Sequence, residues 1–179
     1  MLFRSRMHPP IDDPVHGQPH EAVWPAGVPH ALALPDESLW CPLERNAQEA
    51  PTAPALHFMG RRWTWAELHA EALALAGGLH RLGVGAGDRV LLFMQNCPQY
   101  VLACHALWRL GAVALPVNPM NKADELGHYV QDSGARVALA SADIAPELQR
   151  ASAALPADAR LQHLVWLDLA DALPPAQRT

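Results

Sequence analysis

The stretch Leu107–Pro119, LWRLGAVALPVNP, carries the pattern that decides the fold. Its first residues are typical of the last turn of a helix, and Gly111 stands where a left-handed residue usually ends one. The almost continuous apolar run that follows predicts a parallel strand covered on both faces, which would be a central strand. Pro116 and Pro119 stop that strand from continuing as a regular ladder. Open α/β sheets usually bind ligands at such a strand end, so this loop is a candidate site.

Further strands and helices alternate on both sides of this stretch. Strands are predicted over Arg89–Met94, Ala112–Asn118, Arg136–Ala140 and Leu164–Leu167. Helices are predicted in the three gaps: one started by Asn96 and Pro98, one capped by Asn121 and reaching about Asp132 with Leu126, Tyr129 and Val130 facing inward, and one over Ala145–Ala154. Such alternation is the signature of right-handed crossovers. The expected fold class is therefore α/β, a doubly wound, mainly parallel sheet with helices on both faces.

Upstream of these units the sequence predicts a helix, a hairpin and a second helix. Ser38 is a plausible cap for the first helix, and the hairpin is expected to turn at Met59-Gly60-Arg61. Thr64 and Glu67 have the spacing of a capping box, which would open the long second helix. Apolar residues then recur at steps of three and four, so this helix is expected to pack one face on the sheet.

The segment Gly83–Asp88, GVGAGD, invites a dinucleotide-binding interpretation. That fingerprint must follow a strand and open a helix, whereas this segment follows a helix and precedes a strand. A tight turn between helix and strand, including Gly87, is the better interpretation. Asp88 is expected to fix the turn through its own side chain.

Composition limits the classes of function. The chain of 179 residues has a net charge of -5 and a sequence pI of about 6.0, which gives no attraction to nucleic acid or to an anionic membrane. No apolar run reaches the roughly 18–20 residues that a transmembrane segment needs. Cys41, Cys97 and Cys104 fit neither a disulfide framework nor a zinc site. A reducing cytoplasm is the expected compartment.

Three segments are expected along the chain. Residues 1–37 form a proline-rich extended arm, because seven of the 17 prolines lie before residue 36. Residues 38–169 form a partial α/β domain, and residues 170–179 form a tail. An extended arm is suited to lying on a second copy of the chain, so a homodimer is possible.

The residues alone assign no catalytic, cofactor-binding or metal site. The sequence has no G-x-x-x-x-G-K-[ST] loop, no G-x-S-x-G and no H-E-x-x-H. His69 and His80 are expected at the surface, and His105 is expected to be packed or solvated. The notable residues are interpreted as structural: Thr64, Glu67, Gly87, Asp88, Gly111, Pro116, Asn118 and Pro119.

Several motifs together resemble the N-terminal region of AMP-forming acyl-CoA synthetases of the adenylate-forming superfamily. They are WTWAEL at Trp63–Leu68, GDRV at Gly87–Val90 and the opening stretch Leu107–Pro119. Asn118-Pro119-Met120, Glu125-Leu126 and Asp132-Ser133-Gly134-Ala135 also match the pattern. The resemblance extends from about Ser38 to Leu167 and looks most like medium- and long-chain fatty acyl-CoA ligases.

This resemblance implies that the fold is the first part of the large N-terminal domain of an adenylate-forming enzyme. In the full-length enzyme a carboxylic acid, with fatty acids as the expected substrate class, attacks ATP with Mg²⁺ present, and CoA then displaces AMP from the acyl-adenylate. The family's phosphate loop ending in Pro-Lys-Gly, its other nucleotide motifs and its C-terminal lysine all lie downstream of the region represented here. Lys122, the only lysine, has the wrong context for that loop. No catalytic residue is carried over, and no cofactor is expected to bind this chain alone.

Three interpretations remain at this point. The chain is an N-terminal fragment of a ligase and inactive alone, or it is a stand-alone, non-catalytic module for interaction or dimerisation. A nucleotide-binding regulatory domain is the third, and it would need a phosphate cradle that the sequence does not show.

Overall fold

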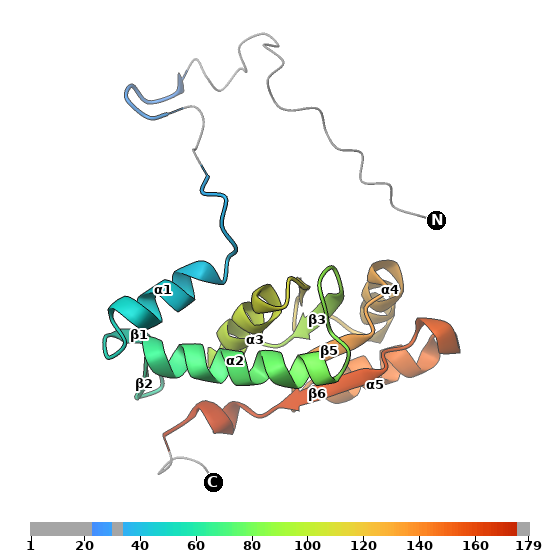
Figure 1. Ribbon diagram of the computed structural model, residues 1–179. Coiled ribbons are helices and arrows are strands. Elements are labelled where there is room, and N and C mark those ends of the chain that lie inside the picture. Colours follow the sequence, from blue (N-terminus) through green and yellow to red (C-terminus); the bar gives the residue numbers. More distant parts are fainter. Residues whose placement is uncertain (1–22, 30–33, 175–179) are drawn as a thin grey trace. The chain divides into compact units, whose positions relative to one another are not determined.

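The computed structural model describes residues 23–29 and 34–174 and divides the chain into two units, residues 1–36 and 37–179 (Figure 1). Most of the predicted arm lies outside the described residues. Within the first unit, the indole Nε1 of Trp24 donates a hydrogen bond to the carbonyl of Val28 at 3.0 Å, which closes a local turn. No helix in the described ranges is long and apolar enough to cross a membrane.

The second unit is built on a parallel four-stranded sheet in the order β4-β3-β5-β6. The strands are β3 (Arg89–Phe93), β4 (Val113–Val117), β5 (Val137–Ser141) and β6 (His163–Leu167). Leu92 of β3 is the register partner of Pro116 on one side and of Leu139 on the other. All four predicted strands are confirmed. Each end of each strand agrees with the prediction or differs from it by one residue.

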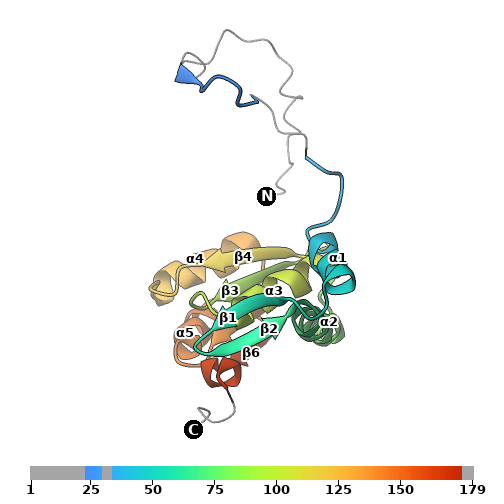
Figure 2. The same ribbon diagram turned by 90° about the vertical axis from the view of Figure 1, so that its left-hand side faces the viewer.

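The strand in the opening stretch is not central, which corrects the sequence prediction. β4 lies at one edge of the sheet, with only β3 beside it, and β6 forms the other edge (Figure 2). Val113 is 46% exposed as a result, Ala114 and Leu115 are only partly buried, and of the five residues of β4 only Val117 is buried. The central strands are β3 and β5. A run of apolar residues fits an edge strand equally well when one neighbouring strand and a helical layer cover part of it.

Two helices cover each face of the sheet, as the doubly wound class requires. Val90 and Leu92 of β3 pack with α2 (Trp65–Arg81) and α3 (Pro98–Arg109). Leu91 and Phe93 point the other way and pack with α4 (Ala123–Ser133) and α5 (Ala145–Ala154). This is the alternation of a strand that is buried on both faces.

A smaller layer precedes the sheet. It comprises α1 (Cys41–Glu49) and the antiparallel hairpin of β1 (Pro54–Phe58) and β2 (Arg61–Thr64). The predicted hairpin turn is confirmed, because Met59 and Gly60 both adopt positive φ, at 44° and 84°. The predicted cap of the first helix is wrong. The Ser38 hydroxyl accepts a hydrogen bond from the N–H of Trp40 at 3.2 Å, and this local turn delays the helix to Cys41.

Two details of the later helices also differ from the prediction. α4 is capped at Lys122 and not at Asn121, because the Glu125 carboxylate accepts the Lys122 N–H at 3.0 Å. Tyr129 is 39% exposed, so it does not face inward. The buried stripe of α4 follows Leu126 and Val130, and Tyr129 lies to one side of it. α3 likewise begins after Cys97 and not after Asn96.

Beyond β6 the chain contacts α3 and the β1–β2 hairpin. The 3₁₀ turn η3 (Leu169–Ala172) follows, and Ala172 is buried. Gln99 Nε2 donates to the carbonyl of Asp168 at 2.8 Å, and Arg61 Nη1 donates to that of Asp171 at 3.1 Å. Residues 175–179 of the predicted tail lie outside the described residues, and the domain boundaries stay predictions.

Candidate functional site

The predicted capping box is present at the start of α2. The Thr64 hydroxyl accepts the N–H of Glu67 at 3.3 Å, and the Glu67 carboxylate accepts the Thr64 N–H at 2.8 Å. That backbone hydrogen bond, followed by one from the Thr64 hydroxyl, lowers the pKa of the Glu67 carboxyl below its ordinary value. The hydrogen bonds of this pair stabilise a helix end.

Replacing Thr64 with alanine should lower the free energy of unfolding by about 1 kcal/mol, because one helix N–H loses its acceptor.

The contribution of Glu67 to the free energy of unfolding should depend on pH. Its folded-state pKa is lowered, so the stabilisation exists above the ordinary pKa and is lost as pH falls through the folded value. Urea denaturation of Glu67→Ala and the unaltered chain should show a difference at pH 7 that shrinks toward about pH 3. A constant difference would contradict this role, and Asp124→Ala, an exposed acid in the first turn of α4, is the control.

Gly87, Asp88 and Gly111 come together where β3 and β4 begin. The Gly87 N–H donates to the Gly111 carbonyl at 2.9 Å, and the Val113 N–H donates to the Asp88 carbonyl at 2.8 Å. The Asp88 carboxylate accepts the Gly85 N–H at 2.8 Å, as the sequence predicted. The cluster joins two strand starts, so it lies at the amino edge of the sheet, opposite the edge where parallel sheets bind ligands.

Pro116, Asn118 and Pro119 lie at the other end of β4. The Asn118 side chain accepts the N–H of Met120 at 3.0 Å and closes the exit turn. The structure therefore separates the predicted residues into three groups: one at the start of α2, one at the amino edge of the sheet and one after β4. None of the three brings together groups that could carry out a reaction.

A cavity of about 140 Å³, which the sequence did not predict, lies at the carboxyl ends of β3, β5 and β6. Its lining comes from the segments that leave these strands: Met94, Gln95, Cys97, Gln99, Ser141, Ala142, Asp143, Leu167, Asp168 and Leu169. Polar residues that directly follow three predicted strands were the available signal, since the carboxyl ends of parallel strands meet at one edge.

The cavity offers hydrogen bonds but no activated group. Within the described residues, Gln99 Oε1 is buried without a hydrogen-bond partner, while its Nε2 is held by Asp168. Burial raises the pKa of the Cys97 thiol, although N–H groups of Tyr100 and Gln99 act in the opposite direction. The thiol is therefore protonated at neutral pH and is a poor nucleophile. No group of three His, Cys, Asp or Glu side chains in the described part of the chain could hold a metal ion.

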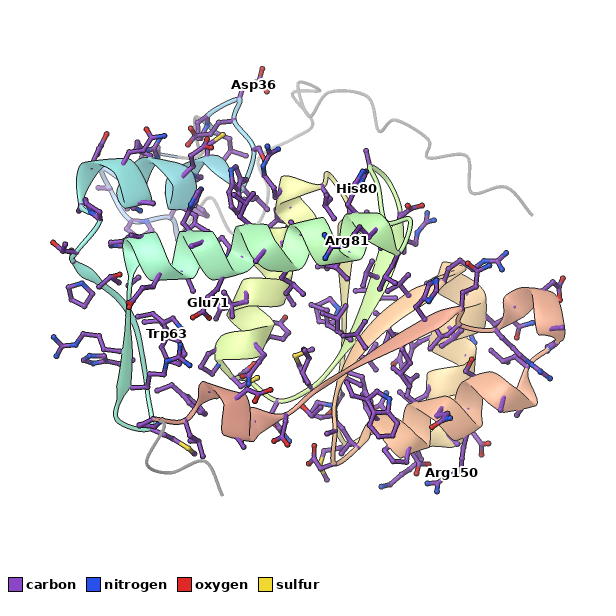
Figure 3. All side chains as sticks on the ribbon, turned by 60° about the horizontal axis from the view of Figure 1, so that its bottom comes forward. Asp36, Trp63, Glu71, His80, Arg81 and Arg150 are labelled. Carbon is purple, nitrogen blue, oxygen red and sulfur yellow. The ribbon has the colours of Figure 1, made fainter. Side chains whose placement is uncertain are left out.

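Other polar side chains stabilise packing. Figure 3 shows Trp63 and Glu71 directed toward one another from β2 and α2. Glu71 accepts from Trp63 Nε1 at 3.2 Å and from Arg61 at 2.9 Å, and the Arg61 guanidinium lies 4.0 Å from the centre of the Trp63 ring. His105 is partly buried, and its Nδ1 lies 2.9 Å from the carbonyl of Val101. Of the two predicted alternatives, packed or solvated, this contact favours the packed one.

The cavity does not identify the protein family, but comparison with known proteins does. The family model described as "AMP-binding enzyme" matches residues 43–178. A long-chain-fatty-acid–CoA ligase of Salmonella typhimurium is 33% identical over 87% of this chain and 28% of its own length. A 4-coumarate–CoA ligase 2 of Oryza sativa is 34% identical over 77% of this chain and 21% of its own.

The chain is also similar to a solved structure of an acyl-CoA synthetase. The Mycobacterium tuberculosis fatty acyl CoA synthetase is 28% identical with a TM-score of 0.66, over 79% of this chain and 28% of that one. The chain thus spans between about a fifth and three tenths of the length of these relatives. Since the family model covers most of the chain and the fold agrees, the chain belongs to the AMP-binding enzyme family and corresponds to part of the N-terminal domain of an adenylate-forming acyl-CoA synthetase.

Proposed function

We propose that this chain is the N-terminal scaffold of an ATP-dependent acyl-CoA ligase. In that enzyme a carboxylic acid, with fatty acids as the favoured class, would form an acyl-adenylate before transfer to CoA. ATP, Mg²⁺ and CoA would be held by residues outside this sequence. The proposed compartment is the cytoplasm, which agrees with three cysteines that form no disulfide.

The observation that carries this proposal is the match of residues 43–178 to the family model, together with the inert polar groups in the same region. Thr64, Asp88 and Asn118 direct their side chains to backbone groups of their own turns. Their hydrogen bonds fix strand and helix ends, which is the role of a scaffold. The lining of the carboxyl-edge cavity contains no Lys or Arg that could pair with a phosphate, which supports the proposal that nucleotide is held elsewhere.

We expect the purified chain to release no pyrophosphate from ATP and Mg²⁺ when palmitate and CoA are supplied. The reason is that the printed sequence contains no phosphate loop, and its only lysine is Lys122. A coupled pyrophosphate assay checks this, with an intact acyl-CoA ligase as the positive control. Turnover above the protein-free blank would refute the proposed inactivity. A gene that continues into a Ser/Thr/Gly-rich loop ending in Pro-Lys-Gly would support the ligase assignment.

The second candidate is a non-catalytic association module, and its feature is the incomplete sheet, since among the described strands β6 has a neighbour on one side. Such a module would make no use of nucleotide. A nucleotide-binding regulatory domain has no comparable support in the described residues. An ATP- or NAD-induced rise in melting temperature would be needed to restore it.

A further inference from the structure

In the described part of the chain, the carboxyl-edge cavity holds a buried acceptor that has no donor. Gln99 lines this cavity, and its Nε2 donates to the carbonyl of Asp168 at 2.8 Å. A carbonyl oxygen only accepts, so this bond fixes which end of the amide is Nε2. The other end is Oε1, which is buried without a hydrogen-bond partner among the described residues. An unpaired buried acceptor destabilises a fold, so a donor is expected to reach Oε1.

The cavity lies among the central strands and not on the free side of β6. Most of its lining comes from the ends of β3 and β5 and the segments that follow them, and both strands have a neighbour on each side. The Leu167 carbonyl accepts the N–H of Ala142 at 3.0 Å, and the Asp168 carbonyl is held by Gln99. These two bonds tie the end of β6 toward the central strands. The space is therefore formed by contacts within the described chain, whatever lies beside β6.

The lining and the volume fit a small and mainly apolar molecule. Met94, Leu167 and Leu169 provide apolar side chains, and the Cys97 thiol behaves as another small hydrophobe. The volume of the cavity is about 140 Å³. An apolar cavity of about 150 Å³ in another protein holds one benzene molecule, so this space fits a single six-membered ring with a small substituent. One water molecule takes up about 30 Å³ and would leave most of the cavity empty.

The charges of the lining disfavour an anion. Asp143 and Asp168 are its two carboxylates, and the lining contains no Lys or Arg. α3 and α5 begin at this edge, and each helix N-terminus contributes about half a positive charge. Two carboxylates outweigh two such helix ends, so the local potential is negative. An ionised carboxylic acid would be repelled, whereas a neutral hydroxyl compound would not.

We propose that the carboxyl-edge cavity binds a small neutral molecule of about the size of phenol, whose hydroxyl group donates to Gln99 Oε1. The ring would contact the apolar side chains, and the hydroxyl would complete the hydrogen bonding of the buried amide. Ser141 also lines the cavity, and its hydroxyl can donate to the oxygen of the ligand. The site lies at the edge where open α/β sheets usually bind ligands. It is independent of the ligase proposal, because its ligand is neither the acid nor the nucleotide of that reaction.

Titration with phenol and toluene, without ATP or CoA, tests binding, since toluene has the shape of phenol without its hydroxyl. In NMR spectra of the chain with methyl-labelled methionine, phenol should shift the signal of Met94, which is 3% exposed and lines the cavity. Met59 and Met120 are 60% and 71% exposed and should not shift, so they are internal references. Benzoate should leave Met94 unchanged. A Met94 signal that does not respond to phenol, or that responds equally to benzoate, would overturn the proposal.

Gln99→Met tests the hydrogen bond. Methionine is close to glutamine in shape but lacks the amide, so the affinity for phenol relative to toluene should fall about fivefold, the usual effect of one neutral hydrogen bond. Gln95→Met is the matched control, because Gln95 lines the same cavity but is exposed, and it should leave this ratio unchanged. A general change in the shape of the cavity affects both probes and cancels in the ratio. The same ratio in Gln99→Met and in the unaltered chain would refute the proposed contact.

Ala142→Leu tests the location of the site. Ala142 lines the cavity, and a larger apolar side chain there should fill the space that the ring needs. Both probes should then lose their effect on the Met94 signal. Circular dichroism melts should show that this variant and the two glutamine variants are folded. Phenol that binds folded Ala142→Leu as tightly as the unaltered chain would show that it binds elsewhere, which would end the proposal.

Discussion

A valine at position 111 should lower the free energy of unfolding of this chain by roughly 3 kcal/mol. Gly111 has φ of +68°, a left-handed conformation that is costly for any residue with a Cβ and most costly for a β-branched one. A Cβ built at this position would lie 3.2 Å from the Cβ of Ala86. The Gly111 carbonyl also accepts the Gly87 N–H, so the backbone cannot rotate away without losing that bond.

Gly134→Val is the matched control for this substitution. Gly134 has φ of +65°, but a Cβ there would meet nothing within 4 Å. Urea denaturation followed by circular dichroism should therefore give a smaller loss for Gly134→Val, of about 1–2 kcal/mol. The difference between the two variants measures the crowding against Ala86. Equal losses would mean that the contact between the two strand starts contributes nothing beyond backbone strain.

Replacing Phe93 with alanine should lower the free energy of unfolding by about 3–5 kcal/mol, the usual cost of removing a buried aromatic ring. Phe93 is 1% exposed, and its strand β3 has a neighbour on both sides. Its ring lies in the core formed with α4 and α5, where the lost volume has no access to solvent. Urea denaturation with a two-state fit gives the value.

Val113→Ala is the comparison that tests the strand order. Val113 lies on the edge strand β4 and is 46% exposed, so its truncation should change stability by no more than about 0.5 kcal/mol. If β4 were central, as the sequence first indicated, the two substitutions would have similar costs. Comparable losses for Val113→Ala and Phe93→Ala would therefore argue against the order β4-β3-β5-β6.

The elements themselves were predictable because local rules determine them. Thr64 and Glu67 have capping-box spacing, and Met59-Gly60 has the composition of a tight hairpin turn, so both features appear where the sequence predicts them. The four strands alternate with helices in the order that parallel crossovers require. Asp88 could be assigned to its turn because its partner, Gly85, is only three residues away.

Strand order and the cavity were not predictable in this way. Whether Val113 is covered depends on which strand lies beside β4, and that neighbour is set by packing between distant segments. Tyr129 fits the spacing of an inward residue, but the stripe through Leu126 and Val130 determines which face of α4 is buried. The carboxyl-edge cavity combines Gln99, Ser141 and Asp168 from three separate units, so no local motif marks it.

The order of the strands has a consequence for synthesis on the ribosome. Of the four described strands of the sheet, β3 is made first and ends between β4 and β5, while β6 is made fourth and lies beside β5. Each of the three later strands therefore finds a neighbour already made, and none of the four has to insert between two earlier ones. The sheet can grow outward in step with translation, starting with β3, and domains that fold as they emerge spend less time with unpaired strands exposed.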